Sequence, residues 1–188
     1  MNIAVDIDDT LTESFDYFLP CVAEYFGVSE SELREKNISY SNLSEEWKKD
    51  EIGFCKAYYD KMAADTPFKS GAAEAVRRLH ELGHKIIIIT GRTKEFYTDP
   101  YETTRRELAN GGIIYDKLIC TLNKAEACVF EKISVLVDDM IANCDAAAKM
   151  GIDVILFESK ANMDIKTDFR KVSDWEEAFS AIFGMEHA

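Results

Sequence analysis

Short, continuous apolar runs alternate along this chain with longer segments of helical periodicity, and this alternation constrains the fold more than any other feature. The runs are rich in branched aliphatic residues and end in polar ones, and we expect strands over 3–7, 85–90, 115–121, 133–139 and 152–157. Strands that are apolar along their whole length are usually covered on both faces, as in parallel sheets flanked by helices. The sequence therefore predicts an α/β fold with a doubly wound, Rossmann-like parallel sheet.

Helices are predicted between these strands, where apolar residues recur with helical spacing. Their expected ranges are 72–82, 99–110, 124–130, 141–150 and 173–183. The second of them has the clearest end signals, because Asp99 suits the N-cap position, Pro100 suits the first turn and Gly111 follows the last turn.

A wholly helical stretch interrupts the alternation between the first and second strands. Its first helix is expected over residues 14–27, with a kink or a break at Pro20. We therefore divide the chain into an α/β core of residues 1–12 and 70–188 and a small helical cap of residues 13–69. The cap is inserted after the first strand and is expected to lie over the carboxyl edge of the sheet.

Composition narrows the classes of partner and compartment. The chain is 47% hydrophobic and 30% charged, as in soluble globular proteins. Its formal net charge of −13 argues against a nucleic acid polymer as partner, because binding phosphate backbones requires a basic surface. Five cysteines without metal-site or disulfide spacing indicate a reducing compartment. With no signal-peptide pattern and no apolar run long enough to cross a bilayer, we expect a cytoplasmic protein without a membrane partner.

Polar side chains follow the predicted strands at their carboxyl ends, which is where ligands bind in doubly wound sheets. If the first strand continues through Asp6 and Asp8, their side chains point to the same side. We expect four separate segments to meet at this edge: Asp6, Asp8 and Asp9; Thr90, Gly91 and Arg92; Lys124; and Asp138 and Asp139.

So many carboxylates in a small volume cannot all ionise without a counter-charge. A hard divalent cation with oxygen ligands supplies one, and Mg²⁺ fits best where a few carboxylates, water and phosphate complete its coordination. Lys124 supplies a second positive charge. A phosphate group can then be bound by Mg²⁺, the Lys124 ammonium, the Thr90 hydroxyl and the backbone N–H of Gly91.

The segments DIDDTLT, IIIITGR, Lys124 and VLVDDM resemble, in this order, the four motifs of the haloacid dehalogenase (HAD) superfamily of phosphohydrolases. The resemblance covers roughly two-thirds of the chain, and its first motif is the most specific. The helical insertion resembles the C1 type of cap in that superfamily. The core resembles most the cytosolic deoxyribonucleotidase-like branch.

The resemblance assigns a role to each catalytic candidate. It implies that Asp6 is the nucleophile, which forms an aspartyl-phosphate intermediate. Asp8 is implied to protonate the leaving oxygen and then to deprotonate the attacking water. Thr90 and Lys124 are implied to orient the phosphate and to balance its charge.

The resemblance also implies how Mg²⁺ is bound. Its ligands are the Asp6 carboxylate, the Asp8 backbone carbonyl and Asp139, with Asp138 behind them, although Asp138 and Asp139 are interchangeable at this stage. Asp9 occupies a position where the family often has glycine, so we expect it to adopt a left-handed conformation.

Several residues allow two interpretations. Arg92, which we group with Gly91 as a substrate-binding candidate, either holds a phosphate or ribose or pairs with a carboxylate to brace its loop. His80 and His84 are expected at the surface. The aromatic residues of the insertion either stack on a nucleobase or form the cap's own core. The core is favoured for most members of this set, which consists of Phe15, Tyr17, Phe18, Trp47, Phe54, Tyr58 and Tyr59.

The sequence thus predicts a Mg²⁺-dependent phosphomonoesterase that acts on a small phosphorylated metabolite, with a nucleoside monophosphate as the candidate substrate. One alternative is a phosphotransferase or mutase of sugar phosphates on the same core. Another is a receiver-like signalling domain, but receivers place their lysine last, whereas Lys124 precedes the late acidic pair. A catalytically inactive binding protein is a further alternative, although every expected catalytic position is filled.

Overall fold

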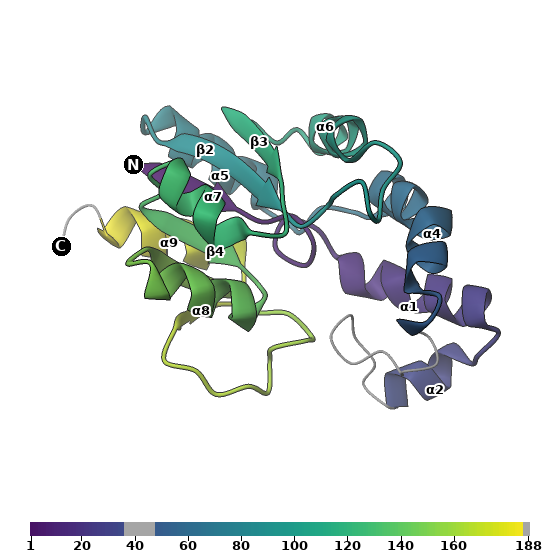
Figure 1. Cartoon of the computed structure of the whole chain (residues 1–188). Coiled ribbons are helices and arrows are strands. Elements are labelled where there is room, and N and C mark those ends of the chain that lie inside the picture. Colours follow the sequence, from purple (N-terminus) through teal and green to yellow (C-terminus); the bar gives the residue numbers. More distant parts are fainter. Residues whose placement is uncertain (36–47, 186–188) are drawn as a thin grey trace.

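Parallel pairing joins six strands into one sheet, with the order β3-β2-β1-β4-β5-β6. The structure is a computed structural model that describes residues 1–35 and 48–185 (Figure 1). The predicted α/β fold with a Rossmann-like sheet is confirmed. The strands are β1 (Asn2–Val5), β2 (Lys85–Thr90), β3 (Lys117–Cys120), β4 (Val135–Asp138), β5 (Asp153–Phe157) and β6 (Arg170–Val172).

Strand β6 was not predicted, because little in its sequence distinguishes it from the polar loop that precedes it. It has three residues, of which Val172 alone is buried. Pairing with β5, in which Leu156 lies opposite Lys171, makes this segment a strand. Neighbouring strands, rather than local propensity, therefore determine its conformation.

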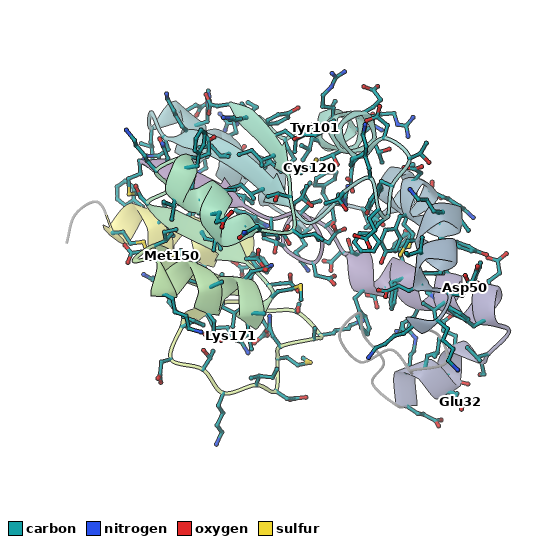
Figure 2. All side chains as sticks on the ribbon, in the orientation of Figure 1. Glu32, Asp50, Tyr101, Cys120, Met150 and Lys171 are labelled. Carbon is teal, nitrogen blue, oxygen red and sulfur yellow. The ribbon has the colours of Figure 1, made fainter. Side chains whose placement is uncertain are left out.

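Helices cover both faces of the sheet, because alternate residues of each strand point to opposite layers. Ile3 and Val5 of β1 pack in one cluster with α5 and α9, whereas Ala4 packs in another with α7 and α8. Helix α6 runs beside the β3 edge, where the Tyr101 hydroxyl accepts a hydrogen bond from the Cys120 backbone N–H (Figure 2). The helices are α5 (Ala72–Glu81), α6 (Pro100–Asn110), α7 (Lys124–Phe130), α8 (Ile141–Lys149) and α9 (Trp175–Met185).

Three helices of the insertion lie together, away from the sheet (Figure 1). They are α1 (Ser14–Phe26), α2 (Glu30–Glu35) and α4 (Glu51–Asp65). Of the kink or break predicted at Pro20, the break is excluded, since α1 continues through this residue until Gly27, whose positive φ of 65° ends the helix. The kink stays a prediction. Division of the chain into a core and a cap at residues 13–69 stays a prediction.

The three helices share an apolar cluster of their own, as the sequence favoured for most of the aromatic residues. Phe18 and Phe54 are fully buried at its centre, with their rings in edge contact at a centroid distance of 5.7 Å. Phe15 is buried in the same cluster, and Tyr58 and Tyr59 pack against it. Tyr17 is exposed, and Trp47 lies outside the described residues.

Two segments that connect these helices to the sheet lie side by side. Thr12 and Phe68 form an isolated antiparallel bridge, and the Lys69 backbone N–H donates to the Leu11 carbonyl at 2.8 Å. An ion pair between Lys69 Nζ and Glu13 Oε2, also 2.8 Å long, joins the same segments. The two segments that connect these helices to the sheet are therefore bonded to each other and do not run separately.

The loop that follows β1 is held by hydrogen bonds within the loop and by one from the last helix. The Ile7 carbonyl accepts from the backbone N–H groups of Leu11 and Thr12, at 2.8 and 3.1 Å. Asp9 has a φ of 57°, which confirms the expected left-handed conformation. The indole N–H of Trp175, on the last helix, donates to the Thr10 carbonyl at 3.0 Å.

Other expectations from the sequence have mixed outcomes. All five cysteines are free thiols. His80 is partly exposed, but His84 is 3% exposed, and its Nδ1 lies 3.1 Å from the N-terminal amine, so its assignment to the surface is wrong. Within the described residues, no helix combines the length and apolarity needed to span a membrane.

We predict that Trp175→Phe lowers the free energy of unfolding by about 1–3 kcal/mol, because the buried Thr10 carbonyl loses its indole donor while most of the ring packing remains. Urea unfolding followed by circular dichroism measures the loss. Ser180→Ala, at an exposed position of the same helix, is the control and is expected to stay within about 0.5 kcal/mol of the wild type. Equal stability of the two variants would contradict the role given to the indole.

Candidate active site

The sheet order places a crevice at the carboxyl ends of β1 and β4. From β1 the chain passes to β2 and β3 on one side, and then returns to β4 on the other side. Such a switch point is where open parallel sheets bind ligands. Val5 pairs with Val137, and the Asp6 backbone N–H donates to the Val137 carbonyl at 3.0 Å, so Asp6 enters the crevice beside Asp138.

Lys124 connects these two acids from the start of α7. Its Nζ lies 2.6 Å from Asp6 Oδ1 and 2.7 Å from Asp138 Oδ2. Burial disfavours the charged ammonium, but the two carboxylates outweigh burial and hold the pKa of Lys124 above its usual value. The lysine is therefore a fixed positive charge within the cluster.

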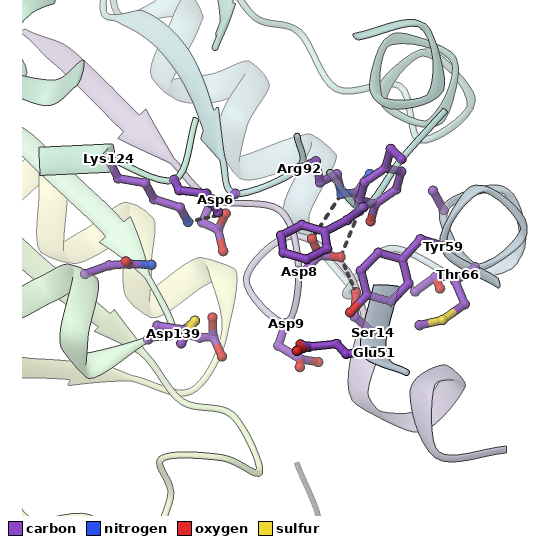
Figure 3. Close-up of a pocket in the computed structure, with 18 residues that line it drawn as sticks. Asp6, Asp8, Asp9, Ser14, Glu51, Tyr59, Thr66, Arg92, Lys124 and Asp139 are labelled. Atoms are coloured by element: carbon purple, nitrogen blue, oxygen red, sulfur yellow. Dashed lines mark hydrogen bonds and ion pairs between the residues drawn. The ribbon is translucent and has the colours of Figure 1, made fainter. Parts of the chain in front are cut away.

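Asp138 and Asp139 have different surroundings, although they are neighbours in the sequence. Asp138 is fully buried, and its Oδ1 accepts from the Met140 backbone N–H at 2.8 Å and from Asn143 Nδ2 at 3.0 Å. The Asp139 carboxylate faces the same space as Asp6 (Figure 3) and has no hydrogen bond or ion pair to any described residue. This geometry favours Asp139 as the direct metal ligand and Asp138 as its support.

The acids of this cluster repel one another and lack full compensation. Burial, together with Asp138 and Asp8 and against the attraction of Lys124, raises the pKa of Asp6 to about 7. Burial and the charges of Asp138 and Asp6 raise the pKa of Asp139 well above its usual value. When all are ionised, three carboxylates and one ammonium leave two negative charges unbalanced.

A divalent cation fits this donor set. One oxygen from each of Asp6, Asp138 and Asp139 lies within 4.8 Å of the others. The donors are all carboxylate oxygens, which Mg²⁺ prefers, and its two charges match the excess. Without such an ion, the burial of so many acids costs folding free energy. The raised pKa values of Asp6 and Asp139 reflect this cost.

Thr90 and Gly91 lie at the end of β2, where the sequence placed them. Thr90 is fully buried and does not line the cavity, and its hydroxyl has no hydrogen-bond partner among the described residues. Gly91 lines the cavity, and a Cβ at this position would meet only Leu122, at 3.8 Å. A buried hydroxyl without a hydrogen-bond partner is costly. The Thr90 hydroxyl can therefore still donate a hydrogen bond to a group other than the described residues. The phosphate contacts of both residues stay predictions.

The condition for Asp6 and Asp8 to point to the same side of one strand is not met, because β1 ends at Val5 and Asp8 lies in the turn that follows. Its Oδ1 and Oδ2 accept from Nη2 and Nε of Arg92, at 2.8 and 3.0 Å, and Oδ1 also accepts from Ser14 Oγ at 2.9 Å (Figure 3). Burial acts to raise the pKa of Asp8, but the charge and hydrogen bonds of Arg92 outweigh it and lower the pKa.

Arg92 is itself buried between two acids. Besides Asp8 it pairs with Glu107, through Nη1 and through Nη2 at 3.2 Å. Of the two interpretations of Arg92, the structure therefore shows the pairing with carboxylates. A direct contact of Arg92 with substrate stays a prediction.

Several polar residues that support the site were not predicted from the sequence. Glu107 lies in the charged segment RREL, where nothing distinguishes a buried acid from an exposed one. Asn143 follows Asp138 by five residues, in the first turn of α8, where a surface asparagine would look the same in the sequence. Asn162 donates to the Asp139 backbone carbonyl at 2.7 Å from a polar loop without periodicity. Spacing alone signals none of these contacts.

A cavity of about 350 Å³ opens between the sheet edge and the insertion. Asp6, Asp8, Asp9, Lys124 and Asp139 are among the charged residues at its sheet side (Figure 3). Much of the remaining lining is apolar or aromatic and comes from α4 and from the segments after β2, β3 and β4: Tyr59, Met62, Ala63, Phe96, Tyr97, Leu122 and Met140. The cavity thus joins a charged floor to a largely apolar wall.

Comparison with known proteins establishes the fold of the core. The sequence matches no family model, and no curated protein matches it. Among solved structures, a haloacid dehalogenase-like hydrolase from Streptococcus pneumoniae has a TM-score of 0.69 at 14% identity, covering 96% of this chain and 97% of that one. A predicted phosphoglycolate phosphatase from Haemophilus somnus has a TM-score of 0.68 at 14% identity, with coverages of 96% and 97%.

A third similar structure is a protein from Thermotoga maritima assigned as a β-phosphoglucomutase, with a TM-score of 0.65 at 14% identity and coverages of 98% and 99%. Near-complete coverage of all three chains shows that this protein has the Rossmann-like core fold of HAD hydrolases. At such low identity the likeness extends to the fold alone.

The raised pKa values predict how metal-free stability depends on pH. Between the unfolded pKa near 3.9 and about 7, the folded state holds protons that the unfolded chain has released, so stability falls as pH rises through this range. We predict that Asp139→Asn raises the metal-free melting temperature at pH 8, by about 2–4 °C for each kcal/mol of repulsion removed. Differential scanning calorimetry measures the change.

Millimolar Mg²⁺ is expected to stabilise the wild type at pH 8, because binding to the folded state alone raises its melting temperature, and to stabilise Asp139→Asn much less. Asp153→Asn, at an exposed position, is the control and should respond to Mg²⁺ as the wild type does. A wild type that does not respond, or an Asp139→Asn variant that responds fully, would rule out the metal site.

Proposed function

We propose that this protein is a Mg²⁺-dependent phosphomonoesterase that uses Asp6 as its nucleophile. The observation that carries the proposal is the buried cluster of Asp6, Asp138 and Asp139 around Lys124 at the switch point of the sheet. Acids that repel one another there require a cation, and a site with fixed cations is suited to a phosphoryl group. Residues 13–69 would act as a cap that encloses the substrate.

In the first step, Asp6 Oδ attacks phosphorus, and the bond from phosphorus to the ester oxygen breaks. Mg²⁺, held by the Asp6 and Asp139 carboxylates and the Asp8 backbone carbonyl, would reduce the repulsion between the phosphate and the attacking carboxylate. Lys124 Nζ, fixed beside Asp6, stabilises charge on the phosphoryl oxygens. The leaving oxygen takes a proton from Asp8, and the product is an aspartyl phosphate.

In the second step, water hydrolyses the aspartyl phosphate. Asp8, now a carboxylate, accepts a proton from the water as its oxygen attacks phosphorus. The bond between Asp6 and phosphorus breaks, which releases inorganic phosphate and restores both acids. The Thr90 hydroxyl and the Gly91 backbone N–H would bind the phosphoryl oxygens in both steps.

We propose a nucleoside monophosphate as the substrate. Tyr59, Phe96 and Tyr97 line the wall of the cavity and suit a planar, largely neutral ring. Among the described residues that line the cavity, the cations are Lys124 and Arg92, and both are already paired with carboxylates, so this lining favours a leaving group without a second anion. The resemblance of the core to the deoxyribonucleotidase-like branch supports the same class.

We predict that the purified protein releases inorganic phosphate from 4-nitrophenyl phosphate with Mg²⁺ and not with a chelator. Asp6→Asn is expected to lose about 10⁴-fold or more in kcat/KM, because an amide cannot replace the nucleophile. Asp145→Asn, at an exposed position of α8, is the matched control. Activity without metal, or full activity of Asp6→Asn, would refute the proposal. Less phosphate than 4-nitrophenol, with phosphate appearing on an added sugar, would identify a phosphotransferase.

For the substrate, we predict that kcat/KM for a nucleoside 5′-monophosphate exceeds that for phosphoglycolate by about 10-fold or more, because phosphoglycolate brings a second anion beside an apolar wall. Tyr59→Ala should lower kcat/KM for the nucleotide by about 10-fold or more through lost stacking. Tyr17→Ala, an exposed tyrosine of the insertion, should have no such effect. Equal use of both substrates, or an inert Tyr59→Ala change, would exclude the nucleotide.

A further inference from the structure

We propose that Glu107, acting through Arg92, positions the Asp8 carboxylate for proton transfer to and from the leaving group. The inference rests on the proposed function, and it assigns to the site a residue that no motif includes. Glu107 lies in α6, and Asp8 lies in the loop after β1, so elements far apart in the sequence are joined by a single guanidinium.

The guanidinium has a fixed geometry. Three of its nitrogens are used, since Nε and Nη2 donate to the two oxygens of Asp8 and Nη1 and Nη2 donate to Glu107. Each carboxylate is therefore bound through both of its oxygens, Asp8 by the Nε side of the planar guanidinium and Glu107 by its Nη end, and this geometry fixes the orientation of both acids. The Arg92 side chain is 3% exposed, so water does not compete for these donors.

The two acids differ in what else they face. The Glu107 side chain is 2% exposed and pairs with Arg92 alone among the described residues, so it serves to hold the guanidinium. The Asp8 side chain is 36% exposed and lines the cavity. Glu107 thus holds the guanidinium, whereas Asp8 faces the cavity, and its Oδ2 accepts a single hydrogen bond and keeps a lone pair for a substrate oxygen.

Helix α6 gives Glu107 a rigid base. Asp99 caps its N-terminus by accepting from the Glu102 backbone N–H, and Thr103 Oγ1 donates to Asp60 Oδ1 of α4 at 2.8 Å. Because α6 contacts both the β3 edge and α4, Glu107 is held by the sheet and by the insertion together. Arg92 therefore keeps a partner when Asp8 exchanges one of its bonds for a substrate oxygen.

Two phosphate esters of similar size but different leaving-group basicity can distinguish whether Glu107 positions Asp8 for proton transfer or only stabilises the fold. Benzyl phosphate leaves as an alkoxide that needs a proton, whereas 4-nitrophenyl phosphate leaves as a stable phenolate. Because kcat/KM reports the steps up to the first bond cleavage, it isolates the role of Asp8 as an acid from its later role as a base.

We predict that Glu107→Gln lowers kcat/KM for benzyl phosphate by about 10²-fold and changes that for 4-nitrophenyl phosphate by less than about 5-fold, as does Asp8→Asn. Arg92→Lys, which keeps the charge but not the fork, should give the same pattern and replaces Glu107→Gln if that variant does not fold. Ile182→Ala, a core truncation far from the site, is the control for lost stability and should leave the ratio of the two esters unchanged.

If Glu107→Gln and Arg92→Lys lower kcat/KM for both esters by the same factor, these residues only support the structure, and the inference is overturned. An unchanged ratio with full activity would overturn it equally. In either case, metal-dependent turnover by the wild type and its loss in Asp6→Asn would still stand for the proposed function. A wild type that cleaves neither ester would instead refute the function itself.

Discussion

The contact of the Lys124 ammonium with Asp6 and Asp138 is the interaction on which the rest of the site depends. Parallel pairing of β1 with β4 brings the two acids to one edge, where they would repel each other without a charge between them. Lys124 balances only part of the cluster, and burial together with the neighbouring acids raises the pKa of Asp139 well above its usual value. The same arrangement that makes the metal-free fold costly is thus the basis on which we propose a bound cation and a phosphate site.

Much of the fold was predictable because burial on both faces leaves a pattern in the sequence. Runs such as residues 86–89 are apolar at every position only if helices cover both sides of the strand, and the structure bears this out. Strand β6 is the exception, because its pairing with β5 is a property of the sheet rather than of its own three residues. Sequence periodicity reports burial, and β6 buries a single side chain.

The candidate site was predictable to the extent that the ends of strands fix it. Asp6, Lys124 and Asp138 meet as expected, because each follows a strand or starts a helix at the switch point. The direction of Asp8 and the pairing of Arg92 with Glu107 were not predictable, since they depend on how a loop turns and on which face of α6 meets the sheet. A charge at one position does not reveal its partner at another.

The hydrogen bond from the indole of Trp175 to the Thr10 carbonyl spans nearly the whole chain. During synthesis, β1 and its acidic loop leave the ribosome well before α9, the helix whose indole closes this loop. A chain that ends before α9 therefore carries Asp8 and Asp9 without the indole that holds their loop in place. In this protein, the loop that carries Asp8 and Asp9 has its full support only once α9 has been made and has packed.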